Sequence, residues 1–163
     1  MKNLPDTPKV SIITMTYNDC AHLEKCVAQI LKQDYENIEY IIVDGGSTDG
    51  THEIIQKAAE KLEDRLKWVS EPDQGLYDAL NKGIRMATGD IVGLMCDEFA
   101  DAHVLSDMVR QMQQDGTDGV HGDIDYMADG KVIRKWRMGA GNARKLRWGW
   151  MPGHPTLYLK KEV

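Results

Sequence analysis

The feature that most constrains the fold is a regular alternation of two kinds of segment over the first hundred residues. Four runs are short, rich in β-branched residues and almost continuously apolar: 10–17, 38–44, 66–70 and 90–95. Such runs are typical of strands that are covered on both faces, as in a parallel sheet. The alternation therefore predicts an α/β fold with a parallel sheet and right-handed crossovers.

Helical patterns separate these runs, because apolar residues recur there at spacings of three and four. The four stripes are Leu23, Val27, Ile30 and Leu31; Ile54, Ile55, Ala58 and Leu62; Leu76, Ala79, Leu80 and Ile84; and Val104, Leu105, Met108, Val109 and Met112. After about residue 116 the chain becomes rich in Gly, Trp and basic residues. Residues 119–139 predict two strands joined at the turn "ADG", and 155–163 begin one more strand.

The charge and hydropathy of the chain exclude some classes of partner. Its 163 residues have a net charge of −6, whereas nucleic-acid binding needs clustered Lys and Arg. No apolar run approaches the roughly 20 residues of a membrane span, and "MKNLPDTPKV" lacks the apolar core of a signal peptide. We therefore expect no nucleic-acid partner, no transmembrane segment and a cytoplasmic protein.

Polar residues follow each of the four expected strands, at 14–19, 44–51, 70–75 and 96–101. Ligands of open α/β sheets bind outside the carboxyl ends of the strands. The four loops should therefore line one crevice.

The loop "DGGSTDGT" at 44–51 allows close backbone approach through Gly45 and Gly46 and could cap the following helix. Asp44 at the strand tip could accept hydrogen bonds from a base or ribose. The alternative is a well-made turn and helix cap alone. The loop is neither a Walker A sequence nor a dinucleotide fingerprint.

Three carboxylates, Asp97, Glu98 and Asp101, follow directly on the fourth apolar run. Mg²⁺ in proteins typically takes one or two carboxylates together with phosphate oxygens and water. Asp97 and Glu98 could supply those carboxylates to a nucleotide diphosphate. The alternative is a solvated acidic loop, and the position after a buried strand favours the metal.

Together, "VSIITMTYND", "IIVDGGSTDGT" and "EPDQGLYDALNKGIRMATGDIVGLMCDE" resemble the N-terminal half of family-2 glycosyltransferases of the GT-A fold. The resemblance covers roughly residues 8 to 125, and "GHPTLYLKKEV" continues it. It implies a Rossmann-like three-layer sandwich with a mainly parallel central sheet, and one domain over 1–163. Residues 8–115 would form the nucleotide-sugar half, and 116–163 the start of an incomplete acceptor side.

The resemblance also assigns roles to matching residues. The nucleobase and ribose would be held by Thr14, Thr16, Tyr17, Asn18 and Asp44. The nucleotide site would be lined further by Asp73, Gly75, Asn81 and Lys82.

For the divalent cation, Mg²⁺ or Mn²⁺, the resemblance implies Asp97, Glu98 and His154. Asp97 would contact the ribose or a metal-bound water, and His154 the metal or the diphosphate. Glu98 stands where relatives have the metal-binding Asp, and it is one methylene longer. Asp123 matches a Gly-Asp near the acceptor and is the candidate for catalytic base, with Asp125 as the alternative.

The implied reaction transfers a sugar, with inversion, from a nucleotide-diphosphate donor to an acceptor hydroxyl. We expect a UDP-sugar donor and a saccharide or lipid-linked acceptor in surface polysaccharide or glycolipid synthesis. The expected location is the inner face of the membrane, and a second copy of the chain is an expected partner.

Two alternatives compete with this interpretation. The family usually places its general base downstream of the His-Pro-Thr segment, so we expect a truncated chain. A catalytically incomplete nucleotide-sugar-binding module would then be the alternative function. A nucleotidyltransferase would need a Gly-rich basic loop after the first strand, and "TYNDC" does not provide one.

The basic run "KVIRKWRMGAGNARKLRW" at 131–148 has two interpretations. It could receive a phosphate of the donor or of a lipid-linked acceptor, or it could be a solvated face. Trp148 and Trp150 could form a platform for a sugar ring or pack in the core.

Overall fold

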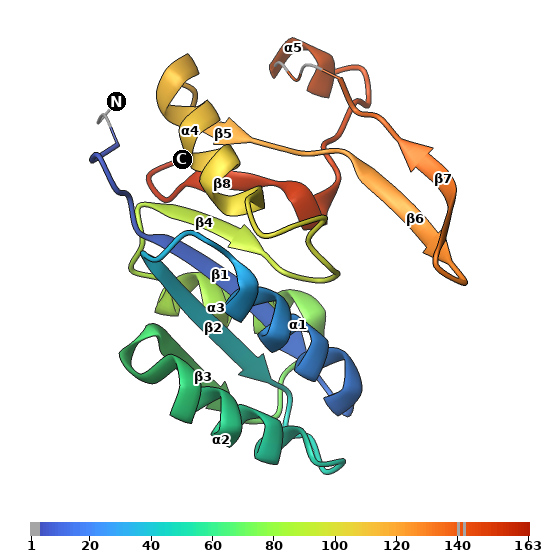
Figure 1. The fold of residues 1–163 in the computed structure, drawn as a ribbon. Helices are drawn as coiled ribbons and strands as arrows, with labels where there is room; N and C mark the ends of the chain where they lie inside the picture. Colours follow the sequence, from blue (N-terminus) through green and yellow to red (C-terminus); the bar gives the residue numbers. More distant parts are fainter. Residues whose placement is uncertain (1–3, 140, 142) are drawn as a thin grey trace.

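A computed structural model describes residues 4–139, 141 and 143–163 of the chain (Figure 1). Its main sheet has six strands in the order β3-β2-β1-β4-β8-β5. Their bounds are β3 Leu66–Ser70, β2 Ile38–Asp44, β1 Val10–Thr16, β4 Ile91–Leu94, β8 Tyr158–Lys160 and β5 Gly119–Val120. β1 to β4 are parallel, and β8 runs antiparallel to both of its neighbours.

Helices cover both faces of this sheet, which gives three layers (Figure 1). Their bounds are α1 Cys20–Lys32, α2 Thr51–Leu62, α3 Leu76–Met86 and α4 Val104–Asp115. The larger core cluster joins β1 and β2 to α1, α2 and α4, and it includes Leu23, Ile55 and Leu105. A smaller cluster on the other face joins Ile13 and Ile41 to α3. The expected α/β sandwich with a mainly parallel sheet is confirmed.

Three expectations about burial are wrong, and the first concerns Leu31, which belongs to the expected stripe of α1 but is exposed. β3 is an edge strand, so its Trp68 is 40% exposed rather than covered on both faces. α3 does not bury the whole expected stripe, because Leu76 and Ile84 are exposed. It packs instead through Ala79 and Gly83; a Cβ on Gly83 would lie 2.5 Å from Ile13 Cγ2. A helix that lies this close to the sheet contacts it through its small residues.

The expected last strand is β8, but its place inside the sheet follows from tertiary packing. Tyr158 is buried and its hydroxyl donates to the carbonyl oxygen of Leu94 at 3.3 Å. Its ring crosses β4 at Gly93, where a Cβ would lie 2.2 Å from ring atoms. Only glycine leaves room for this crossing, so the Gly93–Tyr158 contact locks the second half of the chain to the first.

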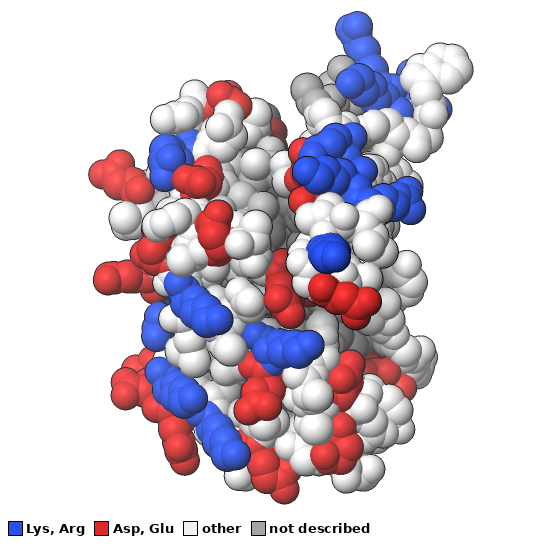
Figure 2. Space-filling model, turned by 45° about the vertical axis from the view of Figure 1, so that its right-hand side comes forward, with Lys and Arg blue, Asp and Glu red and all other residues white. Residues whose placement is uncertain are grey.

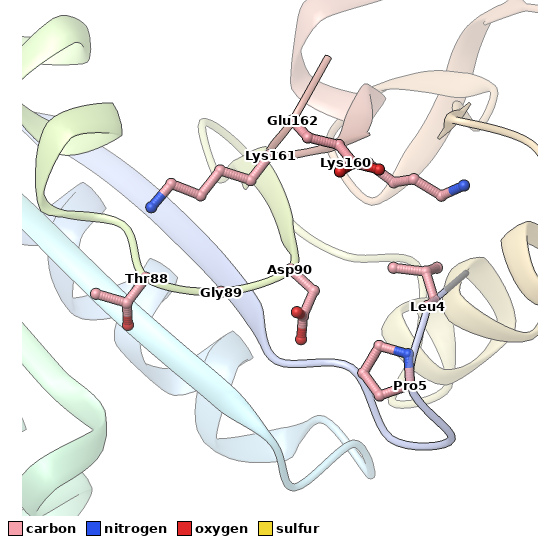
Figure 3. Close-up of a pocket in the computed structure, with 8 residues that line it drawn as sticks. All are labelled: Leu4, Pro5, Thr88, Gly89, Asp90, Lys160, Lys161 and Glu162. Carbon is pink, nitrogen blue, oxygen red and sulfur yellow. The ribbon is translucent and has the colours of Figure 1, made fainter. Parts of the chain in front are cut away.

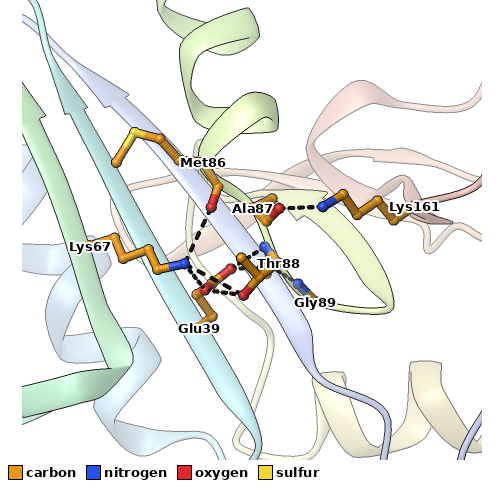
Figure 4. A network of polar contacts seen from close by, with 8 residues as sticks. Glu39, Lys67, Met86, Ala87, Thr88, Gly89 and Lys161 are labelled. Atoms are coloured by element: carbon orange, nitrogen blue, oxygen red, sulfur yellow. Dashed lines mark hydrogen bonds and ion pairs between the residues drawn. The ribbon is translucent and has the colours of Figure 1, made fainter.

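A buried polar network joins the amino ends of the strands (Figure 4). Glu39 accepts hydrogen bonds from the hydroxyls of Ser11 and Thr88, both at 2.6 Å, and pairs with Lys67 Nζ at 2.6 Å. Gly89 N in turn donates to Ser11 Oγ at 2.8 Å. Burial by itself would raise the pKa of Glu39, but Lys67 and the hydroxyl donors outweigh it and lower the pKa to about 2.

The second half of the chain adds a two-stranded antiparallel sheet, β6 (Ile124–Ala128) and β7 (Lys131–Trp136). The expected turn is confirmed: Asp129 and Gly130 have φ of 50° and 72°, as a tight hairpin turn requires. The hairpin projects from the body of the molecule (Figure 1). Three short helices complete the fold: η1 Glu63–Arg65, α5 Ala143–Leu146 and η2 His154–Thr156. Within the described ranges, no helix has the length and apolarity needed to span a membrane.

Candidate functional site

The carboxyl ends of β1, β2 and β3 carry loops that the protein ties together. Asn18, in the loop after β1, has a φ of 49°. Its backbone N–H donates to Ser47 Oγ at 2.7 Å, and its Oδ1 accepts from Thr48 N at 2.8 Å. Both partners belong to the loop after β2. Asn18 therefore fixes the distance between two of the loops expected to line the crevice.

Asp44 is the last residue of β2, and it holds the loop that follows β2 through hydrogen bonds. Its carboxylate accepts from Ser47 Oγ at 2.5 Å, from Ser47 N at 3.1 Å and from Ser70 Oγ at 2.6 Å. The residue is completely buried. In this structure Asp44 therefore positions the ends of β2 and β3 and offers no surface of its own to a ligand.

Three residues from different loops meet above the end of β2: Tyr17, Gly45 and Asp73. A Cβ on Gly45 would lie 2.9 Å from Asp73 Oδ2 and 3.2 Å from Tyr17 Cδ2. Tyr17 is 65% exposed, and Asp73 Oδ1 accepts from Gly75 N at 2.8 Å. An exposed aromatic face beside an anchored carboxylate, over a bare glycine, is a surface onto which a flat polar ring can stack.

The two threonines of β1 differ in their surroundings. Thr14 is 1% exposed; its hydroxyl donates to the Met95 carbonyl at 3.0 Å and accepts from Tyr40 at 2.9 Å. It therefore supports the junction of β1 with the end of β4 and has almost no surface for a nucleotide. Thr16 is half-buried, and within the described residues its buried Oγ1 has no hydrogen-bond partner. An unpaired buried hydroxyl is costly unless a ligand or water satisfies it.

Of the expected site residues in α3 and the loop before it, some make contacts within the protein and others are exposed. Gly75 precedes α3 with a φ of 111°, a conformation that favours glycine. Lys82 Nζ pairs with Glu71 at 3.0 Å and donates to the Pro72 carbonyl at 3.2 Å. The hydrogen bond to Glu71 is the main reason why the pKa of Lys82 is raised. Lys82 thus braces this loop, and Asn81 is exposed on the helix.

The three carboxylates after β4 have different roles. Asp101 is used by the protein, because its Oδ1 accepts from His103 N at 2.8 Å ahead of α4. Asp97 and Glu98 are exposed and make no hydrogen bond or ion pair with any described residue. Their charge reaches the buried thiol of Cys26, whose pKa is raised to about 12 chiefly by burial and then by Cys96 and Asp97. Two carboxylates held at a strand end without a protein cation are suited to a hard divalent ion.

The expected third metal ligand does not complete a metal site from protein atoms. His154 is exposed at the start of η2. Over the part of the chain that the structure describes, no group of three or more His, Cys, Asp or Glu could hold a metal ion. Asp97 and Glu98 fit a cation whose remaining ligands come from a diphosphate and water.

Asp123 lies at the base of the hairpin, where a basic side chain engages it. Its Oδ1 accepts from Met138 N at 3.0 Å, and its Oδ2 lies 3.5 Å from Arg137 Nε. Arg137 also pairs with Asp125 at 2.6 Å. Through these contacts, Asp123 joins the two ends of the hairpin.

Sequence reasoning considered Ser47 only as a helix cap and missed how two serines support this site. Ser47 and Ser70 bind the carboxylate of Asp44, and Ser47 also receives the loop after β1. The one available signal was the position of both serines directly after expected strands. Short hydroxyl side chains are so common in turns that this signal is weak.

A separate hollow of about 440 Å³ lies at the opposite, amino ends of β1 and β4 (Figure 3). Lys160 and Lys161 line it, but Lys160 pairs with Asp118 at 3.0 Å and Lys161 donates to the Ala87 carbonyl at 2.5 Å. With these two cations already engaged, we do not assign this hollow to the functional site.

The sequence of the chain resembles those of known glycosyltransferases. The model of the glycosyl transferase family 2 matches residues 11–161. A PGL/p-HBAD biosynthesis glycosyltransferase from Mycobacterium bovis is 36% identical over 120 residues, which cover 72% of this chain and 47% of that protein. The chain spans less than half the length of the curated relatives it matches.

Solved structures of other proteins have a similar fold. A mannosyltransferase from Pyrobaculum calidifontis in complex with GDP-Man and Mn²⁺ is 30% identical, with a TM-score of 0.64 over 73% of this chain and 36% of that one. TarS from S. aureus in complex with UDP-GlcNAc is 20% identical, with a TM-score of 0.70 over 94% of this chain and 45% of that one. The second likeness concerns the fold alone. Sequence and architecture agree, and this chain belongs to glycosyl transferase family 2, with the GT-A type of α/β sandwich.

Proposed function

We propose that the chain binds a nucleotide-diphosphate sugar, with a UDP-sugar as the expected donor, across the carboxyl ends of β1 to β4. The observation that carries the proposal is the meeting of Tyr17, Gly45 and Asp73 at the same edge of the sheet that carries Asp97 and Glu98, two carboxylates with no partner among the described residues. The base would stack on Tyr17 over Gly45. Asp73 would accept hydrogen bonds from its polar edge or from the ribose.

The diphosphate would extend from there towards the end of β4, where Asp97 and Glu98 would hold Mg²⁺ or Mn²⁺. When bound, such an ion neutralises the negative charge that develops on the leaving diphosphate. The Pyrobaculum mannosyltransferase, solved with GDP-Man and Mn²⁺, supports this part of the proposal. Glu98 reaches one methylene further than an Asp, so the chain places its ligand oxygen further from the backbone.

The proposed reaction is inverting transfer of the sugar to a hydroxyl of a saccharide or lipid-linked acceptor, in the cytoplasm at the inner face of the membrane. Residues 8–115 would form the donor half, and residues from 116 onwards the beginning of the acceptor side. Transfer needs a base on the acceptor hydroxyl.

One observation favours binding without transfer as the second candidate function. Asp123, the first candidate for the base, is held by Arg137 and by Met138 N. Asp125, the alternative, pairs with the same Arg137. Both carboxylate oxygens of Asp123 are thus engaged by the protein itself, so Asp123 is held in the hairpin rather than free to meet an acceptor hydroxyl. The second candidate predicts metal-dependent UDP binding but no sugar transfer and no donor hydrolysis.

The test is calorimetry with UDP, GDP and dTDP, each with and without Mn²⁺. We expect one nucleotide to bind at least about tenfold more tightly with Mn²⁺. Glu98→Ala should remove the Mn²⁺ effect and leave thermal unfolding without ligand unchanged. Asp101→Asn is the matched control, because Asp101 binds His103 N and keeps an acceptor oxygen as Asn.

Equal effects of Glu98→Ala and Asp101→Asn would contradict a metal site at this loop. No metal-dependent binding of any of the three nucleotides would contradict the donor site itself. Product analysis with the bound UDP-sugar then separates transfer from binding alone.

A further inference from the structure

Charge is distributed unevenly along this chain. Residues 131–150 contain seven Lys and Arg and no Asp or Glu, although the net charge of the whole chain is −6. The rest of the molecule is therefore strongly acidic. Figure 2 shows basic side chains gathered along the projecting part of the molecule, above a body where acidic and basic side chains alternate.

Contacts within the protein engage only some of these cations. Arg137 pairs with Asp125 and Asp123, and the Arg134 guanidinium lies 5.3 Å from the centre of the Tyr126 ring. Four others form no ion pair with any described residue, and all four are exposed: Lys131, Lys135, Arg144 and Arg147. These four define what we call the basic ridge, which runs from β7 to α5.

Large apolar side chains are interspersed with the basic ridge. Trp148 is 90% exposed, Ile133 68% and Met127 56%. Ile133 is the extra residue of a β-bulge, because Arg134 pairs with Tyr126 while Val132 pairs with Met127. A bulge re-aims the side chain it carries. The apolar groups therefore belong to the same segments as the four cations of the basic ridge, the hairpin β6–β7 and the stretch from α5 to Trp148.

We propose that the basic ridge binds the surface of an anionic phospholipid membrane. Lys and Arg near such a surface are attracted to its headgroups, while Trp and aliphatic side chains enter the boundary between headgroups and acyl chains. Nucleic acid fits less well, because its phosphate backbone offers nothing in which Trp148 and Ile133 can be buried. The hairpin also projects from the body of the molecule (Figure 1), and two of its own carboxylates, Asp123 and Asp125, are engaged by Arg137.

The basic ridge would provide the contact with the membrane at the proposed location. The proposal of membrane binding does not depend on the donor site. The chain could bind a membrane without binding a nucleotide, and it could bind a nucleotide without binding a membrane. The two proposals therefore fail separately.

The experiment measures co-sedimentation of the chain with vesicles of phosphatidylcholine alone and of phosphatidylcholine mixed with phosphatidylglycerol. At about 0.15 M salt, we expect the partition coefficient to rise at least about tenfold with the anionic lipid. Salt at about 1 M should reverse this gain.

The variant Lys131→Gln with Arg147→Gln should lower the partition coefficient about 25-fold, or about fivefold for each cation. Lys57→Gln with Lys61→Gln, on the exposed side of α2, is the matched control with the same change of charge. The control should bind as the unchanged protein does. Circular dichroism and thermal unfolding should be equal for both variants.

Tryptophan emission tests whether Trp148 enters the membrane. A blue shift with anionic vesicles is expected in the unchanged chain and should be largely lost in Trp148→Phe, which keeps an apolar ring and should still sediment.

Three results would overturn the proposal. They are equal binding to both kinds of vesicle, an equal loss in the α2 control, and tighter binding to a labelled DNA or RNA duplex that the ridge variant abolishes.

Discussion

The two halves of this molecule use their polar and apolar side chains in opposite ways. In β1 and β2 nearly every residue is buried, and the buried polar groups Glu39, Asp44 and Thr14 are hydrogen-bonded within the protein. In β6 and β7 nearly every residue is exposed, and unpaired cations lie beside apolar side chains. The central strands β1 and β2 hold the shape of the first half, whereas the hairpin strands β6 and β7 have side chains available for a partner.

The comparison predicts that the same residue type contributes differently to stability in the main sheet and in the hairpin. Tyr158→Ala should lower the free energy of unfolding by about 3 to 5 kcal/mol, because it removes a buried ring from the junction with β4. Tyr126→Ala, on the hairpin, should cost less than about 1 kcal/mol. Urea unfolding measures both. Equal losses would show that the hairpin packs against something in solution.

Buried and exposed carboxylates give the next largest difference. Glu39→Gln should cost about 2 to 3 kcal/mol above pH 5, because the buried network loses its anion. The depressed pKa of Glu39 means that its stabilisation is complete above the ordinary value of 4.5 and is lost as the pH falls towards about 2.

Asp125→Asn is the matched control, because Asp125 pairs with Arg137 at the surface. It should change the free energy of unfolding by less than about 0.5 kcal/mol. Acid unfolding between pH 5 and pH 2 should become shallower in Glu39→Gln and stay unchanged in Asp125→Asn. A slope that is the same in all three proteins would contradict the role of the network.

Apart from the controls, the substitution with the smallest expected effect on stability, Gly45→Ala, should weaken nucleotide binding. Gly45→Ala places a methyl group against Asp73 and Tyr17; both side chains can move, so the cost in stability should stay below about 1 kcal/mol. Nucleotide affinity should fall about tenfold by calorimetry, because the stacking surface is blocked.

Gly122→Ala is the control in the second half, where a Cβ would meet Met108 at an ordinary 3.7 Å. Its nucleotide affinity should equal that of the unchanged chain. A normal affinity in Gly45→Ala would instead place the base away from Tyr17.

The sequence predicted the regular elements well, because their signals are local. β-branched runs marked β1 to β4, spaced apolar stripes marked α1 to α4, and Asp-Gly marked the hairpin turn. The edge position of β3 was missed, because hydrophobicity does not reveal whether a strand has a second neighbour. The exposure of Leu76 and Ile84 was missed because Gly83 sets how closely α3 approaches Ile13.

For the site, the sequence predicted which loops gather but not how each side chain is used. Asp44 and Lys82 both have the chemistry to bind a nucleotide. The structure shows one buried under Ser47 and Ser70 and the other paired with Glu71. Their partners come from other strands and loops, so no local pattern could assign them.

The sequence by itself therefore determined the α/β class, the order of the elements and the family. Those properties follow from hydrophobic periodicity and from motifs read along the chain. Only the tertiary structure decided that β8 enters the sheet antiparallel beside β4, that Gly45 lies under Asp73 and Tyr17, and that the basic ridge stands free. Each of these depends on contacts between segments far apart in the chain, where packing and charge pairing decide which groups the protein uses itself.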